Sequence, residues 1–227
     1  MEIIPAILPK NFEEIKEKIG AIVGIAPIVQ IDLCDGKFVH SRTWPFGPRD
    51  VESFQNIVKE DEGMPFWEDV DIELDLMIEN VEEKLSELLI IGPKRIVFHY
   101  ASLKNPLEFF ENLDTYIKSN FEIGLAISPT LDIENIVDII RQVNFVQCMG
   151  IDHVGAQGEN FDEKTIEQVV KVREIFPNIL ISVDGGVNEE NIGALIDAGA
   201  DRFVIGSAIF NSFDPKNSLK NFLYMIQ

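Results

Sequence analysis

The stretch 29–39, VQIDLCDGKFV, joins a short apolar strand pattern to a turn. In its first residues, Gln30 and Asp32 alternate with aliphatic side chains. Asp35-Gly36, farther along, is a turn signal. Alternate residues of a strand share a face, so Gln30 and Asp32 are expected to point the same way. An amide and a carboxylate at the end of a strand are costly to bury without partners. The stretch therefore predicts a strand that ends in one half of a polar site.

The same pattern of a strand followed by a helix recurs eight times along the 227 residues. The predicted strands are 2–8, 28–33, 70–77, 95–99, 122–127, 145–149, 179–184 and 202–205. The predicted helices are 12–23, 50–59, 81–90, 106–119, 132–142, 162–176, 188–198 and 217–226. Strict alternation implies a parallel sheet, and eight repeats favour an α/β fold of the closed (β/α)8 TIM-barrel type. No change in composition marks a linker, so we expect a single domain over 1–227.

An open, doubly wound sheet is the alternative α/β arrangement. It would need a glycine-rich fingerprint directly after the first strand. The chain has Pro5-Ala6-Ile7-Leu8-Pro9 there instead. The barrel is therefore the favoured architecture.

Composition narrows the class of protein. Hydrophobic residues make up 46% of the chain, which is enough for a large core, and the formal net charge is −20. Such a charge argues against a nucleic-acid backbone or an anionic membrane surface as a partner. The two cysteines, Cys34 and Cys148, fit a reducing compartment better than a disulfide framework. With no leader or membrane-length apolar run in the sequence, we expect a soluble, cytoplasmic protein.

Polar side chains stand at the ends of four predicted strands. They are Gln30 and Asp32, Asp75, His99 and Asp184. In a barrel of this type, the site is built at the carboxyl ends of the strands. Three carboxylates there stay ionised only if a divalent cation or a nearby Lys or Arg compensates them; otherwise a raised pKa leaves at least one of them protonated. Any one of them could cap a loop or a helix, but three together with Gln30 favour a site.

Glycines follow the last two predicted strands. Gly185 and Gly186 come after strand 179–184, and Gly206 and Ser207 come after strand 202–205. Glycine lets backbone amides approach a ligand closely, and a short helix beginning near Ser207 would direct its N-terminus at an anion. In this fold, the loops that follow the seventh and eighth strands form a recurrent phosphate site. The two pairs together predict phosphate binding.

These motifs resemble the ribulose-phosphate 3-epimerase family. The similar segments are 5–8 (PAIL), 32–39 (DLCDGKFV), 74–78 (LDLMI), 183–187 (VDGGV) and 206–210 (GSAIF). The resemblance implies an isomerase that inverts C3 of a ketopentose phosphate, with ribulose 5-phosphate and xylulose 5-phosphate as the pair. One aspartate removes the C3 proton and another returns it on the far side, through an enediolate.

The resemblance also implies roles for individual residues. Asp32 and Asp184 match the acid/base pair. Met77 and Met149 match positions that line the intermediate, while Gly185, Gly186, Gly206 and Ser207 match the phosphate site. The implied partner is a small phosphosugar, and we expect a homo-oligomer.

The chain departs from the family at the residues that bind the metal. The family uses two histidines and two aspartates, and the histidine positions here are Gln30 and Asp75, beside the retained Asp32 and Asp184. An all-oxygen set of ligands suits Mg or Mn better than Zn. We expect a divalent cation, with Mg, Mn, Zn, Fe and Co as the candidates, and an absent metal stays open.

Two further functional hypotheses stay open. Ala6 stands where the family has a serine, and the loop 153–158 differs from the family's phosphate loop. The chain could therefore be a related barrel enzyme that acts on another phosphosugar with an altered metal or none, or a sugar-phosphate binder without catalysis. A substrate panel separates the first of these from the epimerase.

Several other side chains near the predicted mouth have two interpretations. His99 is expected to make a structural hydrogen bond. His40 and His153 could replace lost metal ligands, although exposed loop histidines are the common case. Trp44 could form a lid or pack beneath its own loop, and packing is favoured. Cys34 is expected to act as a small apolar filler.

Overall fold

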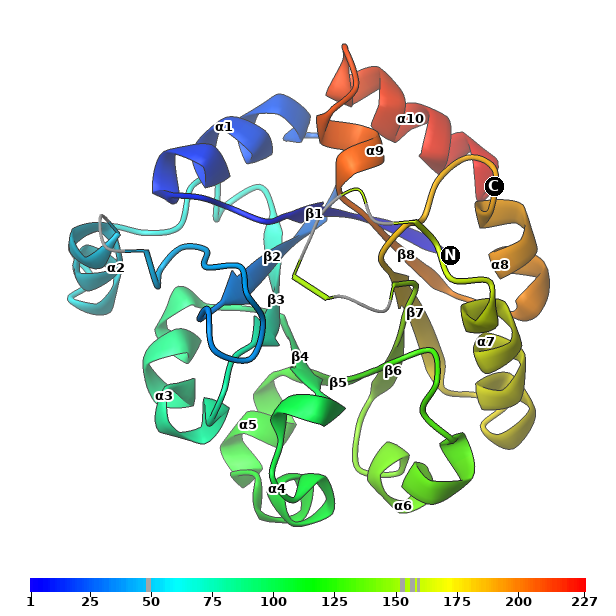
Figure 1. Cartoon of the computed structure of the whole chain (residues 1–227). Coiled ribbons are helices and arrows are strands. Elements are labelled where there is room, and N and C mark those ends of the chain that lie inside the picture. The colour runs from blue at the N-terminus through cyan, green and yellow to red at the C-terminus, as the bar shows by residue number, and fades with distance from the viewer. Residues whose placement is uncertain (48–49, 152–153, 156–157, 159) are drawn as a thin grey trace.

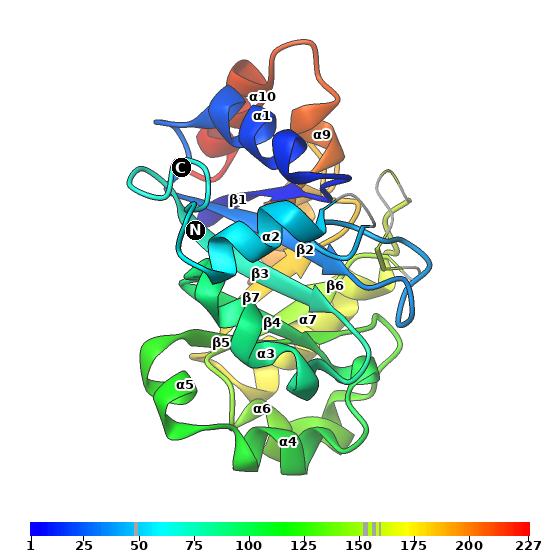
Figure 2. The same cartoon turned by 90° about the vertical axis from the view of Figure 1, so that its left-hand side faces the viewer.

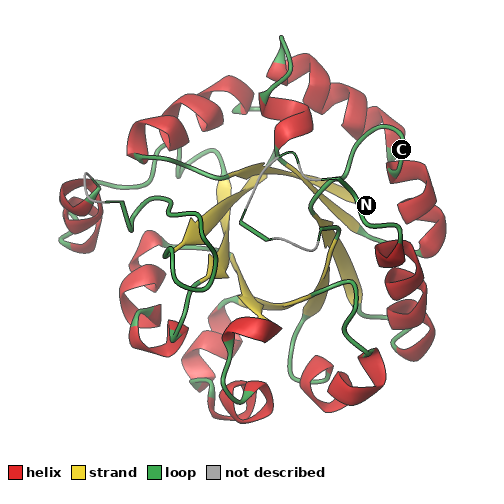
Figure 3. Ribbon diagram, in the orientation of Figure 1, coloured by secondary structure: helices red, strands yellow, loops and turns green. Residues whose placement is uncertain are grey.

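The computed structural model describes residues 1–47, 50–151, 154–155, 158 and 160–227. Its eight strands are parallel and close into a barrel in the order β1 to β8, with the helices outside (Figures 1 and 3). Closure is direct, because β1 pairs with β8 from Glu2 opposite Arg202 to Pro5 opposite Ile205. The (β/α)8 barrel predicted from the sequence is confirmed, and the open sheet is excluded.

The strands lie within one residue of their predicted bounds. They are β1 (Glu2–Ile7), β2 (Ile28–Cys34), β3 (Asp71–Met77), β4 (Arg95–His99), β5 (Glu122–Ile127), β6 (Phe145–Met149), β7 (Leu180–Asp184) and β8 (Arg202–Ile205). Each strand alternates between a face that packs against the helices and a face that points into the barrel. On β3, for example, Leu74 and Leu76 belong to the large outer core. Glu73, Asp75 and Met77 are therefore placed on the inner face.

The helices agree less closely with the sequence prediction. The longer ones are α1 (Phe12–Ile22), α2 (Val51–Val58), α4 (Pro106–Asn112), α5 (Thr115–Asn120), α7 (Lys164–Ile175), α8 (Ile192–Ala198) and α10 (Pro215–Met225). The short ones are η1 (Val81–Glu83), α3 (Leu85–Leu88), η2 (Leu89–Ile91), η3 (Tyr100–Ser102), η4 (Ile133–Ile136), α6 (Val137–Ile140) and α9 (Ser207–Phe210). Among the described residues, none of these helices is long and apolar enough to cross a bilayer.

Three predicted helices are interrupted. The segment 81–90 forms η1, α3 and part of η2, and Asn80 before it has a left-handed backbone (φ 52°) and makes no capping bond with its side chain. The segment 106–119 breaks at Leu113, which is extended, and Asp114 then caps α5 by accepting from the Tyr116 N–H. The segment 132–142 starts as a 3₁₀ turn. At Leu113, the competing cap at Asp114 overrides the helical spacing of the apolar residues.

The predicted start of helix α8 is also wrong. The sequence pattern predicts Asn188 as the cap of a helix that begins there, whereas α8 begins at Ile192. The Asn188 Oδ1 accepts from the N–H groups of Glu190 and Asn191, at 2.8 and 3.3 Å. This side chain therefore closes a turn ahead of the helix.

Charged side chains meet at the amino-terminal end of the barrel. Arg95 pairs with Glu2 at 2.9 Å and with Glu122 at 3.0 Å. Arg202 pairs with Glu122 at 2.7 Å and lies 5.0 Å from the ring of Phe145. This ion network fills the amino-terminal end. The loop after β2 and helix α9 both lie at the opposite end, where the strands finish (Figure 2).

Glu73 lies fully buried above this network, 3.5 Å from Arg95. Burial raises the pKa of its carboxyl from 4.5 to about 8, against the opposing effect of Arg95 and Arg202. A carboxyl that holds its proton more tightly in the folded state stabilises the fold below the unfolded pKa, and that contribution is lost as pH rises through about 8.

We therefore expect the pH dependence of stability to change in Glu73→Gln. Between pH 5 and 8, the unfolding free energy of the wild type should fall relative to that of the variant, by at most about 1.4 kcal/mol per pH unit. Denaturant unfolding at several pH values measures this difference. Glu83→Gln, on an exposed turn, serves as the control. Parallel pH curves for the wild type and Glu73→Gln would show that Glu73 is ionised in the fold.

Candidate active site

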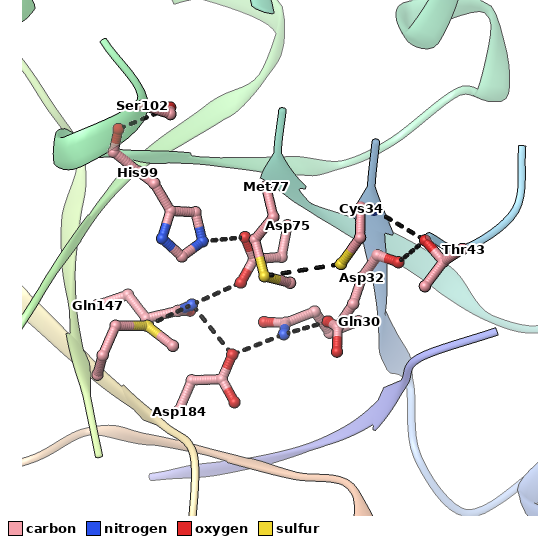
Figure 4. Close-up of polar contacts among 11 residues, drawn as sticks. Gln30, Asp32, Cys34, Thr43, Asp75, Met77, His99, Ser102, Gln147 and Asp184 are labelled. Atoms are coloured by element: carbon pink, nitrogen blue, oxygen red, sulfur yellow. Dashed lines mark hydrogen bonds and ion pairs between the residues drawn. The ribbon is translucent and has the colours of Figure 1, made fainter. Parts of the chain in front are cut away.

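Three carboxylates converge at the carboxyl end of the barrel. Asp32 on β2, Asp75 on β3 and Asp184 on β7 bring one oxygen each to within 4.8 Å of one another. Asp32 and Asp75 are register partners on neighbouring strands, whereas Asp184 is delivered from across the mouth. The structure thus brings together the three aspartates that the sequence places at strand ends (Figure 4).

Two glutamine amides connect these carboxylates. Gln30 Nε2 donates to Asp32 Oδ1 at 2.8 Å and to Asp184 Oδ2 at 2.9 Å. Gln147 Nε2 donates to Asp75 Oδ2 at 3.0 Å and to the same Asp184 oxygen at 3.2 Å. Both side chains are completely buried. Within the described part of the chain, the Oε1 atom of each glutamine has no hydrogen-bond partner.

Gln147 is the residue that the sequence analysis missed. It lies on β6 two positions before Met149, so the two side chains share the inner face of that strand. The same period-2 argument that places Gln30 beside Asp32 would have found it. A polar residue on the inward face of a central strand was the available signal.

His99 completes the hydrogen bonding of Asp75. Its Nε2 lies 2.6 Å from Asp75 Oδ1, and its ring packs against Phe38 with centroids 5.6 Å apart. Both oxygens of Asp75 are therefore engaged, one by His99 and one by Gln147. Among the described residues, the hydrogen bonds to Asp32 and Asp184 use one oxygen of each. Those two aspartates keep an oxygen for a ligand.

The environment favours the protonated form of Asp32 and Asp184. The pKa of Asp32 is raised well above its ordinary value, first by burial and then by the charges of Asp184 and Asp75. Burial and the charge of Asp75 raise the pKa of Asp184 to about 7. A hydrogen bond from Gln30 opposes the shift in both cases. Two carboxyls this close can share protons near neutral pH.

A cavity of about 50 Å³ lies directly over these groups. Asp32 and Asp184 line it together with Met77 and Met149, which are both buried. Cys34 lies behind Met77, with its Sγ 3.8 Å from the methionine sulfur, and burial raises the pKa of its thiol. Cys34 is thus a buried, protonated filler, as expected.

The two glycine loops line the same cavity. Gly185 and Gly186 follow β7 with φ of 103° and 68°, which favours glycine. A Cβ on Gly186 would lie 2.9 Å from the Cα of Phe161. Gly206 precedes α9, the short helix that the sequence predicts from Ser207, and both residues line the cavity. The predicted phosphate residues therefore lie beside the predicted acid/base pair.

The other side chains with two interpretations are Trp44, His40 and His153. Trp44 is fully buried, stacks near Phe12 and donates to Ser53 Oγ at 2.9 Å, so it packs beneath its loop. His40 is exposed at the mouth. His153, named as a possible replacement ligand, lies outside the described residues.

Comparison with known proteins adds independent findings. A model described as "Ribulose-phosphate 3 epimerase family" matches residues 2–210. A ribulose-phosphate 3-epimerase of Helicobacter pylori (strain J99 / ATCC 700824) is 27% identical over 224 residues, covering 97% of this chain and 95% of the relative. That of Aquifex aeolicus (strain VF5) is 29% identical over 215 residues, covering 92% and 90%.

Solved structures share the fold at lower identity. A structure described as KGPDC from Streptococcus mutans in complex with D-R5P has a TM-score of 0.73 and 13% identity, covering 99% of this chain and 96% of that one. A 3-hexulose-6-phosphate synthase has a TM-score of 0.65 and 20% identity, with 97% of each chain covered. At these identities the likeness concerns the barrel alone.

Proposed function

The chain belongs to the ribulose-phosphate 3-epimerase family, and on that premise we propose that it interconverts D-ribulose 5-phosphate and D-xylulose 5-phosphate. The observation that carries the proposal is the pairing of Asp32 and Asp184. They come from different strands, line one cavity, and keep a carboxylate oxygen each for a ligand. The glycine loops after β7 and β8 lie at the same cavity.

Acid/base chemistry follows from the two aspartates. Inversion at C3 needs one ionised carboxylate to remove the proton and one protonated carboxyl to return a proton to the opposite face. Burial raises the pKa of both Asp32 and Asp184, which favours a state in which one of them keeps its proton while the other is ionised. Gln30 holds an oxygen of each residue, which fixes both carboxylates in orientation.

The other cavity residues bind and shield the ligand. We assign the phosphate to the backbone amides around Gly186 and Ser207, because glycine there allows close approach. Met77 and Met149 cover the reacting carbons with apolar, polarisable atoms and exclude water.

The donor set also fits a divalent cation. Asp32, Asp75 and Asp184 would hold it, and the Oε1 of Gln30, which has no hydrogen-bond partner among the described residues, is a fourth candidate oxygen. These are oxygen ligands, which Mg²⁺ and Mn²⁺ accept readily. When bound, the cation neutralises negative charge that develops on the substrate oxygens.

Exchanging the amide for an imidazole should change cation selectivity. In Gln30→His we expect the ratio of Zn²⁺ to Mn²⁺ affinity to rise about tenfold, because zinc prefers nitrogen ligands. Calorimetric titration with each metal alone measures the ratio. Gln168→His, at a buried glutamine on α7, is the control. An unchanged ratio in Gln30→His would exclude Gln30 as a ligand.

Turnover of D-ribulose 5-phosphate tests the proposed function directly. We expect D-xylulose 5-phosphate to form after addition of Mg²⁺ or Mn²⁺ to chelator-treated protein. A folded protein that binds the sugar phosphate yet forms no product with Mg, Mn, Zn, Fe or Co would contradict the proposal. Product from another ketose phosphate alone would support the related-enzyme hypothesis instead.

A further inference from the structure

A second, larger pocket opens beside the carboxylates. It has a volume of about 560 Å³ and lies over the carboxyl ends of β4 and β5. Met149 and Gly155 line both this pocket and the small cavity, so the two are adjacent. His99 and Ser128 contribute to its floor from the ends of those strands. The proposed epimerase chemistry does not use this space.

The pocket lies on the far side of the mouth from the phosphate glycines. In the closed order β1 to β8, strand β4 is four positions from β8, and the two lie across the barrel from each other (Figure 1). Gly206 and Ser207 follow β8. A ligand with its phosphate at these residues and its reacting carbon between Asp32 and Asp184 therefore directs its other end toward the larger pocket.

One wall of the pocket is a well-ordered turn after β2. The Asp35 carboxylate accepts hydrogen bonds from the backbone N–H groups of Lys37 at 2.8 Å, Phe38 at 3.1 Å and Glu79 at 3.0 Å. Thr43 ties the far end of the same loop to β2 by accepting from the Cys34 N–H at 2.8 Å. The backbone that carries Lys37 is thus held in place before any ligand arrives, which lowers the ordering cost of binding.

The charge of this wall is opposite to that of the protein as a whole. The chain has a formal net charge of −20. Yet Lys37 lines the pocket, and its described lining contains no Asp or Glu. Tyr100, Ser41 and Ser128 add hydroxyl groups. A lysine beside hydroxyl donors, with no carboxylate in the described lining, is a local attractor for an anion in an acidic protein.

We infer that this pocket binds a second anionic group at the end of the ligand opposite the first phosphate. The ligand class is a ketose phosphate that carries a phosphate or carboxylate at its far end as well. The inference rests on the proposed function for the place of the first phosphate. Lys37 is the residue that distinguishes such a ligand from a simple ketopentose phosphate.

D-ribulose 1,5-bisphosphate is the probe that tests the inference, with D-ribulose 5-phosphate as its singly phosphorylated match. In calorimetric titration with chelator present, we expect the bisphosphate to bind about tenfold more tightly. In Lys37→Met the ratio of the two affinities should fall toward one. Lys59→Met, at the exposed end of α2, should leave the ratio unchanged.

A steric variant gives a second measurement. Ala126→Phe fills the floor of the pocket at β5. It should weaken binding of the bisphosphate more than binding of the monophosphate. Equal affinities in the wild type, or equal losses for both ligands in Lys37→Met, would overturn the inference while leaving the epimerase proposal intact. A folded protein that binds neither ligand would contradict the phosphate site and the inference together.

Discussion

Replacing Asp32 or Asp184 by asparagine should lower kcat for D-ribulose 5-phosphate about 10³-fold. Asparagine keeps the shape of aspartate and can still meet the Gln30 amide through its oxygen, so the cavity is retained. What it cannot do is accept or return the C3 proton. Each variant removes one half of the acid/base pair, so we expect losses of similar size from the two positions and little further loss in the double variant.

A coupled assay for D-xylulose 5-phosphate measures these losses. Thermal unfolding and titration with the sugar phosphate confirm that each variant folds and binds. Asp138→Asn, at an exposed side chain on α6, is the matched control and should keep full activity. If either site variant retained more than about a tenth of the wild-type rate, that aspartate would not be an acid/base residue.

Replacing Gln147 by glutamate should have the second largest effect, lowering kcat about 10²-fold and stability by on the order of 3 kcal/mol at pH 8. In the wild type the Gln147 amide donates to Asp75 and Asp184. The variant places a fourth carboxylate where that donor lay, directly against Asp75 and Asp184. At pH 5 the new carboxyl can take up a proton and donate again, so we expect a smaller deficit there.

Gln168→Glu is the control for a buried glutamine elsewhere. Gln168 donates to the carbonyl oxygens of Ser128 and Leu131, away from the carboxylates. This variant should lose stability while keeping the wild-type KM and kcat. Gln147→Leu removes the donor without adding charge and should lower kcat with little change in KM. Equal kcat losses at Gln147 and Gln168 would mean that Gln147 has only a structural role.

The fold could be read from the sequence because strand patterns are local. Apolar residues alternate with inward polar ones in 28–34 and 71–77, and both strands form where this alternation predicts. The three aspartates also follow from position, since strand ends of a barrel meet at one mouth. Their roles come from the family resemblance, and the homo-oligomer and the single domain over 1–227 stay predictions.

Pairings between distant residues could not be read in this way. The hydrogen bond from Gln147 to Asp75 joins residues 72 positions apart. Nothing in the local pattern of β6 indicates which carboxylate its amide meets. The break of the helix at Leu113 likewise depends on a competing cap at Asp114, which helical spacing does not weigh. Where a side chain could bond to either of two partners, contacts with residues distant in the sequence determine which one it takes.

The fate of the C3 hydrogen in D₂O tests the central claim most directly. With two aspartates on opposite faces, D-xylulose 5-phosphate formed from D-ribulose 5-phosphate should carry deuterium at C3, as followed by proton NMR. In Asp32→Asn or Asp184→Asn, the remaining aspartate should exchange the C3 hydrogen of one epimer without producing the other. Product that keeps its original hydrogen, or a folded protein that binds the substrate with neither conversion nor exchange, would contradict the two-aspartate account.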